Sequence, residues 1–264
     1  MSADNTLPFD IRLMNGVASV LYLLIALGLL ATALLWLSRA PWLGFRVIQL
    51  EGDLQRNSVA TIRANAAPRL AGNFISIDLD QARASFETVP WVRQATLRRI
   101  WPDRLAVHLD EHQPVALWLG DDGNQRLVNQ QGEVFEANVG DVEDEALPEF
   151  SGPEGSSAQM LSLYRRLAPL FAAHQMQPQA LQLSGRGSWG VELDTGASVV
   201  LGRGSEDELV ARSERFLRTL GQVTGRFERD LEHADLRHAD GYAVRLRGIT
   251  TTIVPAGAAA KKTR

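Results

Sequence analysis

The sequence predicts an α+β fold behind a single N-terminal transmembrane helix. Three observations support this prediction: an uncharged apolar run near the N-terminus, a block with the order strand–helix–helix–strand–strand, and a longer block in which strands alternate with two helices. We expect the two blocks to form separate domains, at residues 45–113 and 114–250. A chain of 264 residues is long enough for two domains of ordinary size.

The composition excludes several classes of protein. The chain is 45% hydrophobic and 22% charged, which is typical of globular proteins. Lys and Arg total 27 against 31 Asp and Glu, so the net charge of -4 gives no support to a nucleic-acid partner, which usually requires a basic surface. There is no Cys, which excludes disulfides, thiolate catalysis and zinc sites built on Cys.

The apolar run lies at residues 17–37, where no side chain is charged. At about 1.5 Å per residue it spans roughly 30 Å, the thickness of the hydrocarbon core of a bilayer. A cleaved signal peptide is the alternative, but its apolar core is usually about 7–15 residues and follows a positive segment. We therefore predict an uncleaved helix after a short segment at residues 1–16. Arg12 in front of the helix and Arg39 and Arg46 behind it do not fix its orientation.

The first domain is predicted from capping residues, prolines and alternation. Pro68 and Pro90 end two helical stretches, and Trp101-Pro102-Asp103 supplies a turn between two strands. The expected elements are a strand at 45–51, a helix from Ser58, a helix capped by Asp78, and strands at 92–100 and 104–110.

The second domain shows more strands, separated by turn-rich segments such as Asp121-Asp122-Gly123-Asn124. We expect Pro169 to kink the first of its two helices. The last residues, 251–264, are predicted to form a flexible basic tail. The expected elements are strands at 115–119, 126–129, 133–135, 181–184, 189–193, 198–201, 232–237 and 242–247, and helices at 158–174 and 206–221.

Two apparent catalytic motifs fail on their context. Residues 108–112 spell H-x-x-E-H, but they alternate like a strand, in which side chains four residues apart lie about 13 Å from each other and cannot share a zinc ion. Residues 185–190 spell G-x-G-x-x-G, but a hairpin follows instead of the helix that a dinucleotide site needs. Residues 201–205 precede a helix but lack the Lys-Ser/Thr of a phosphate loop. The sequence predicts no catalytic centre, no metal and no cofactor.

The ordered motifs resemble the FtsQ/DivIB family of bacterial cell division proteins, and residues 45–113 resemble the POTRA domain of that family. The resemblance covers nearly the whole chain from Phe45 to about Arg247. It rests on the segments Pro90-Trp91-Val92, 98–105, 108–116, Val128-Asn129 with Gly132, Leu147-Pro148, 152–155, Trp189, 201–204 and Asp235-Leu236-Arg237.

The resemblance implies a cytoplasmic N-terminus at residues 1–16, one helix in the inner membrane, and a periplasmic POTRA domain and β-domain. Members of the family are essential, non-catalytic scaffolds that link early and late division proteins at the septum. They hold the FtsB–FtsL pair, and FtsB adds a strand along an open edge of the β-domain. Contacts with upstream division proteins such as FtsK are expected through the POTRA domain, for which the edge at Val92–Leu97 is a candidate, or through the membrane segment.

The resemblance also indicates which residues bind FtsB. Arg237 is the best candidate, as a cation that can fork onto a carboxylate of the partner. The other candidates are His238, Gly241, Tyr242 and Val244 along the same edge, and Arg203 in a neighbouring loop. A terminal strand at 242–247 would leave backbone N–H and C=O groups open for strand addition.

The chain departs from the family pattern at two of these positions. His238 stands where Tyr is common, and Leu246 stands where Trp is expected. We hypothesise that Tyr242 restores the lost aromatic contact.

Two other classes of protein remain open at this point. One is a POTRA-bearing envelope assembly or transport factor, which would usually repeat the POTRA unit or end in a barrel of many strands. The other is a membrane-anchored envelope hydrolase, which would need a nucleophile or a metal site.

Overall fold

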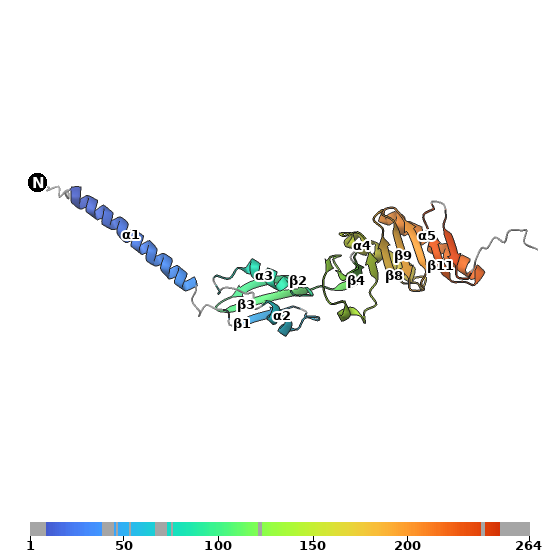
Figure 1. Ribbon diagram of the computed structural model, residues 1–264, viewed down its shortest axis with the longest axis horizontal. Helices are drawn as coiled ribbons and strands as arrows, with labels where there is room; N and C mark the ends of the chain where they lie inside the picture. The colour runs from blue at the N-terminus through green and yellow to red at the C-terminus, as the bar shows by residue number, and fades with distance from the viewer. Residues whose placement is uncertain are drawn as a thin grey trace, which may run out of the picture. The chain divides into compact units, whose positions relative to one another are not determined.

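The computed structural model describes residues 9–38, 45, 47–52, 54–66, 73–74, 76–120, 123–238 and 241–248. The expected tail at 251–264 lies outside this part of the chain, as do residues 1–8 and Asp121-Asp122 of the expected turn. The chain divides into two compact units, residues 1–112 and 113–264, which are described separately (Figure 1). The predicted α+β fold class is confirmed.

The first element is helix α1, Phe9–Ser38. Its segment Met14–Ala33 has a mean hydropathy of 2.2 and none of it is buried. Large side chains such as Leu29 are 67% exposed. Ser19 and Thr32 donate their hydroxyl groups to the carbonyl oxygens four residues earlier, which satisfies them within the helix. The helix is therefore long and apolar enough to be a single-pass membrane anchor.

The remainder of the first unit has the predicted element order. A three-stranded sheet has the order β1-β3-β2, with β1 parallel and β2 antiparallel to β3. Asp78 caps the second helix as expected, because its carboxylate accepts the backbone N–H groups of Asp80 and Gln81. The elements are β1 Val47–Glu51, α2 Val59–Ala66, α3 Leu79–Glu87, β2 Val92–Ile100 and β3 Arg104–Glu111. The core contains Ile62, Phe86, Ala95, Leu105 and Leu109.

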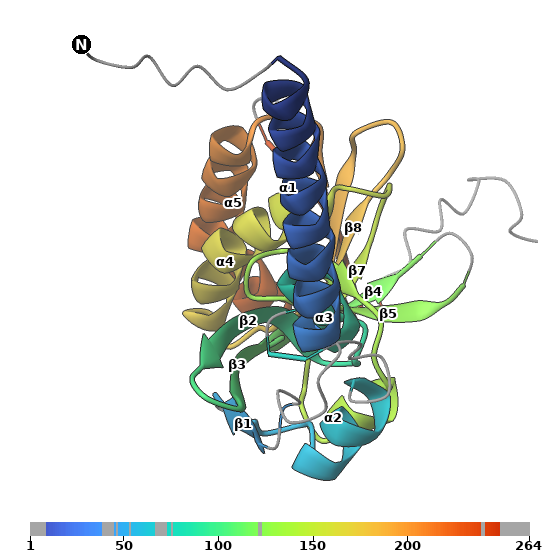
Figure 2. The ribbon, with the colours of Figure 1, turned by 90° about the vertical axis from the view of Figure 1, so that its left-hand side faces the viewer.

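The second unit is built on one nine-stranded sheet with the order β12-β11-β10-β9-β8-β7-β4-β5-β6. Helices α4 Ser157–Ala172 and α5 Glu206–Phe227 lie side by side (Figure 2). Large side chains from the helices, such as Phe171 and Phe216, pack with Trp118, Phe150 and others from the sheet. The remaining elements are β4 Pro114–Leu119, β5 Gln125–Asn129, β6 Val134–Phe135, η3 Val139–Val142, β7 Glu149–Ser151, β8 Pro178–Leu183, β9 Trp189–Leu193, β10 Ser198–Gly202, β11 Leu231–Asp235 and β12 Ala243–Leu246.

The structure differs from the sequence-based expectation in several elements of this unit, among them β8, which begins at Pro178 instead of residue 181. Strand β7 was not expected, because three residues are too few to show a period; it pairs in parallel with both β4 and β8. Helix α5 continues past Gly221 to Phe227 and ends where Glu228 adopts a left-handed conformation, with φ 50°. Strand β11 ends at Asp235 instead of Arg237.

Candidate partner-binding edge

The candidate site is the end of the large sheet that is formed by β12. This strand pairs antiparallel with β11 and, among the residues that the structure describes, with no other strand. One side of its backbone is therefore open for hydrogen bonds with another chain.

The backbone directions follow from the neighbouring strands. Leu236 donates its N–H to the carbonyl of Val200, over 2.8 Å, on the β10 side of the chain. Since backbone groups alternate in direction along a strand, Asp235 directs its groups to the other side, towards its pair Ala243 in β12. The next residue, Val244, then directs its N–H and C=O away from β11. These are the groups that an added strand would meet.

Two side chains hold this edge on the hydrophobic core. Tyr242 and Val244 both pack against the core cluster. The Tyr242 ring meets the Phe216 ring of α5 edge-on, with 5.1 Å between ring centroids and an interplanar angle of 89°. The Tyr242 hydroxyl shares a hydrogen bond with the Thr219 hydroxyl, also on α5. The aromatic contact of Tyr242 is thus made within the chain, and its role towards a partner stays a prediction.

Arg237 lies beside β11 with its guanidinium on Asp235. Its Nη2 is 2.6 Å and its Nε 3.1 Å from Oδ2 of Asp235, while Nε and the backbone N–H also bind Oδ1 at 2.9 and 3.0 Å. These bonds lower the pKa of Asp235 from 3.8 to about 2, mainly through the side-chain hydrogen bond from Arg237. The same bond raises the pKa of Arg237. The Arg237 side chain stays 63% exposed, so a partner can reach it, but it already has a carboxylate.

The other predicted residues lie around the same end of the sheet. His238, Gly241 and Tyr242 line a depression of about 10 Å³, together with Leu236 and with Arg212 and Arg215 of α5. Exposed Arg203 is connected to α5, because its carbonyl accepts the Arg212 guanidinium over 2.7 Å. A Cβ on Gly202 would lie 2.7 Å from Cγ of Arg237, so Gly202 and Arg237 are neighbours.

Sequence reasoning missed the internal partners of this edge. The sequence motif Asp235-Leu236-Arg237 does not by itself indicate a pair, although Asp and Arg two residues apart in an extended segment lie on one face. Phe216 and Thr219 were not connected with Tyr242. Their contact joins residues 23 positions apart, and no sequence period shows such a contact.

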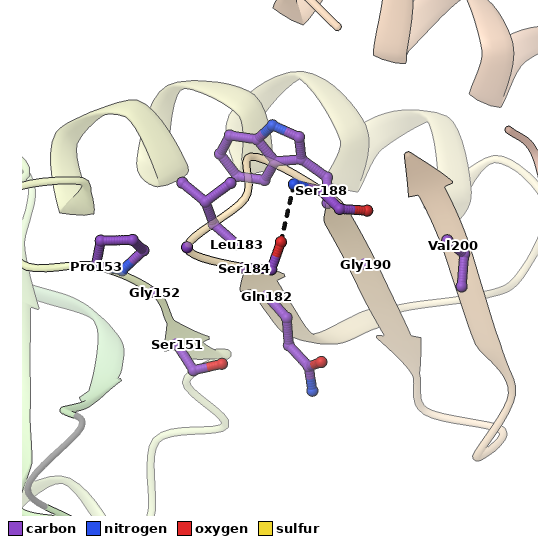
Figure 3. Close-up of a pocket in the computed structure, with 11 residues that line it drawn as sticks. Ser151, Gly152, Pro153, Gln182, Leu183, Ser184, Ser188, Gly190 and Val200 are labelled. Atoms are coloured by element: carbon purple, nitrogen blue, oxygen red, sulfur yellow. Dashed lines mark hydrogen bonds between the residues drawn. The ribbon is translucent and has the colours of Figure 1, made fainter. Parts of the chain in front are cut away.

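A second surface feature is a hollow of about 590 Å³ at β8 and β9 (Figure 3). It includes Gly190, which has no side chain to fill it, and the β8–β9 turn, where Ser188 donates its N–H to Oγ of Ser184 over 2.9 Å. The turn belongs to a hairpin, as its sequence predicts, and not to a dinucleotide site. Among the lining residues that the structure describes, none carries a titratable side chain.

The H-x-x-E-H segment lies in strand β3 and at its end, which agrees with the strand expected there. The carboxylate of Glu111 is an acceptor for the chain after β1. It receives the backbone N–H groups of Gln55, Arg56 and Asn57 at 2.8, 3.0 and 2.9 Å. Glu111 therefore has a structural task that the zinc motif did not suggest.

Comparison with known proteins agrees with the two units. Residues 43–112 match the family model described as "POTRA domain, FtsQ-type", and residues 116–237 match "Cell division protein FtsQ/DivIB, C-terminal". The second match ends at Arg237, before β12. The fold thus defines a POTRA-bearing protein, with one long apolar helix near the N-terminus in the part of the chain that the structure describes.

Curated relatives match most of the chain. A protein named "Cell division protein FtsQ" from Thiomonas arsenitoxydans is 41% identical over 94% of this chain and 91% of its own length. Its namesake from Burkholderia pseudomallei is 42% identical over 91% of this chain and 94% of its own length. The protein of the same name from Bordetella pertussis is 36% identical over 90% of this chain and 92% of its own length. This chain belongs to the FtsQ/DivIB family of bacterial cell division proteins.

Proposed function

We propose that this chain is a non-catalytic scaffold of the division machinery that binds FtsB, and through it FtsL, by strand addition along β12. In this proposal the N-terminus is cytoplasmic, α1 spans the inner membrane, and the POTRA domain (residues 45–113) and the second unit lie in the periplasm, concentrated at the septum. Membership of the family supports a role in cell division. Contacts with upstream proteins such as FtsK are assigned to the POTRA unit or the membrane segment.

The observation that carries the proposal is the open side of β12 at Val244. An added strand gains affinity from main-chain hydrogen bonds, and side chains nearby select the partner. The anchoring of Tyr242 on Phe216 and Thr219 supports this role, because it holds the edge in place before a partner arrives.

Charge beside the edge indicates the character of the partner. Arg237 is exposed, and Arg245 of β12 is 62% exposed and forms a long ion pair with Glu232, at 3.8 Å. Arg212 and Arg215 lie at the depression next to His238. A segment of FtsB with acidic residues flanking its pairing strand would complement this end of the sheet.

The test separates backbone pairing from side-chain packing at one position. The full chain in nanodiscs is titrated with the periplasmic segment of FtsB from the same cell. Val244→Pro removes the outward N–H without removing a bond to β11, whereas Val244→Ala keeps this N–H and loses packing. We expect at least a tenfold loss of affinity for Val244→Pro and less than a threefold loss for Val244→Ala.

Equal affinity of the wild type and Val244→Pro would overturn strand addition at this edge. Arg237→Glu provides the second comparison, with Arg218→Glu on the exposed side of α5 as its control. Binding weakened by Arg237→Glu and unchanged by Arg218→Glu would support a role of the Arg237 cation. Absence of binding by the folded wild type would remove FtsB as the partner of this chain.

A further inference from the structure

An exposed tryptophan stands out at the turn between β2 and β3. The side chain of Trp101 is 81% exposed, more than any other large apolar side chain that the structure places outside α1. It is followed by exposed Pro102, so the tip of this turn is apolar on its surface. Exposed indole rings favour the interface between water and lipid, because they are apolar with one polar N–H.

The register of the sheet places this turn at the end of the sheet where β1 begins. Val47 at the start of β1 pairs with Arg104 at the start of β3, and Arg104 pairs with Ile100 at the end of β2. Val47 itself is 45% exposed. At about 3.3–3.6 Å per residue, the chain from Ser38 at the end of α1 to Val47 reaches at most about 32 Å. This end of the sheet is therefore within reach of the surface of any bilayer that α1 crosses.

Two cations flank the turn. Arg99 and Arg104 are both exposed, and Arg99 donates to the carbonyl of Ile77 over 2.7 Å. Arg104 forms no ion pair with any residue in the described part of the chain. Asp103, the acidic residue of the turn, is half-buried. An apolar tip beside the exposed guanidinium of Arg104 matches a leaflet whose lipids carry phosphate groups.

We propose that the β2–β3 turn contacts the bilayer: Trp101 inserts its indole at the level of the headgroups, and Arg104 binds a phospholipid phosphate. The proposal rests on the membrane-spanning role of α1 in the proposed function, but not on FtsB. The contact would add a second attachment point beside α1 and limit the rotation of the three-stranded sheet relative to the membrane.

The test uses the full chain, labelled with 5-fluorotryptophan, in nanodiscs of phosphatidylethanolamine and phosphatidylglycerol. The Trp101 fluorine resonance is assigned by its loss in Trp101→Phe. Trp91 is the internal control, because it is only 3% exposed and precedes the opposite end of β2, roughly 30 Å away. We expect a nitroxide on the lipid headgroup to broaden the Trp101 resonance at least threefold more than that of Trp91.

A Trp101 resonance that a water-soluble gadolinium chelate broadens, and that the lipid nitroxide affects no more than Trp91, would overturn the proposal. If that resonance were then protected by an added protein, the tip would be a protein-binding site instead. Arg104→Glu tests the charge contribution. It should at least halve the broadening by the lipid nitroxide, and an unchanged value would exclude phosphate binding by Arg104.

Discussion

The guanidinium of Arg237 donates hydrogen bonds from both its Nε and its Nη2 to the carboxylate of Asp235, at the residue where β11 ends. Asp235 is mostly buried and Arg237 is mostly exposed. The ion pair therefore fixes the orientation of the Arg237 guanidinium, while the rest of that side chain stays accessible to solvent. A carboxylate from a partner would therefore share an arginine that is already oriented, and would not find a free one.

The pair gives the folded state a pH dependence of a definite sign. Folding lowers the pKa of Asp235 from 3.8 to about 2, so the stabilisation is complete above about pH 5 and is lost as the pH falls towards 2. We expect Arg237→Gln to reduce the free energy of unfolding in urea at pH 6 and to have a smaller effect at pH 2.5. Arg218→Gln is the control without an ion pair among the described residues. An equal effect of Arg237→Gln at both pH values would contradict this prediction.

The hydrogen bond between Tyr242 and Thr219 should stabilise the edge strand measurably. Tyr242→Phe keeps the ring on Phe216 and removes the hydroxyl, with an expected cost of about 1 kcal/mol. Thr219→Val should cost a similar amount, and the double variant should cost less than the sum of the two. Hydrogen exchange of the β12 amides measures the effect where it acts. Additive costs would show that the two hydroxyls do not depend on each other.

Gly132 is expected to tolerate no side chain. It has φ 84°, and a Cβ there would lie 2.6 Å from Cα of Ala158 in α4. The Gly132 carbonyl also accepts the Ser157 hydroxyl over 2.6 Å, so the turn cannot move away without losing that bond. We expect Gly132→Ala to destabilise the unit by about 3 kcal/mol. Gly123→Ala is matched in backbone conformation, with φ 76° and open space around it, and should cost about 1 kcal/mol. Equal costs in urea unfolding would refute the contact argument.

Glu111 should matter for the first unit through its three backbone hydrogen bonds. Glu111→Gln keeps the size of the side chain and removes one acceptor oxygen, so one or two of the three N–H groups of residues 55–57 lose this acceptor. We expect a loss of about 2 kcal/mol. Asp110→Asn is the control, because the Asp110 side chain is half-exposed and its Oδ1 makes a long contact, 3.5 Å, with Nε2 of His108. Faster hydrogen exchange at residues 55–57 in Glu111→Gln alone would support this assignment.

Much of the fold could be predicted because periodicity and capping act locally. Asp78 and its helix, the turn at Trp101 and the hairpin at residues 185–190 all follow from residue types within one or two turns of chain. Strand β7 was missed because its three residues are defined by their neighbours β4 and β8 and show no period of their own. The predicted end of helix α5 at Gly221 is too early. The low helix propensity of Gly221 is offset, in a helix of 22 residues, by the buried side chains that precede it on one face.

The candidate edge could be located but not described in detail. Its position at the end of the sheet agrees with a terminal strand expected at 242–247. The packing of the Tyr242 and Val244 side chains against the core depends on the register of β11 and β12 and on the position of α5. Both are tertiary properties. For the same reason the sequence indicated a partner-binding role for Arg237 but not its hydrogen bonds to Asp235.

From β7 to β12 the strands of the large sheet follow one another in space as they do in sequence. Pairing can therefore advance as each segment arrives, since each new strand needs only the one made before it. The proposed binding edge is formed by β12, the last strand among the residues that the structure describes, so a nascent chain that stops short of residue 246 would present a different edge strand. Recognition at β12 would thus distinguish a chain with all nine of these strands from an interrupted one.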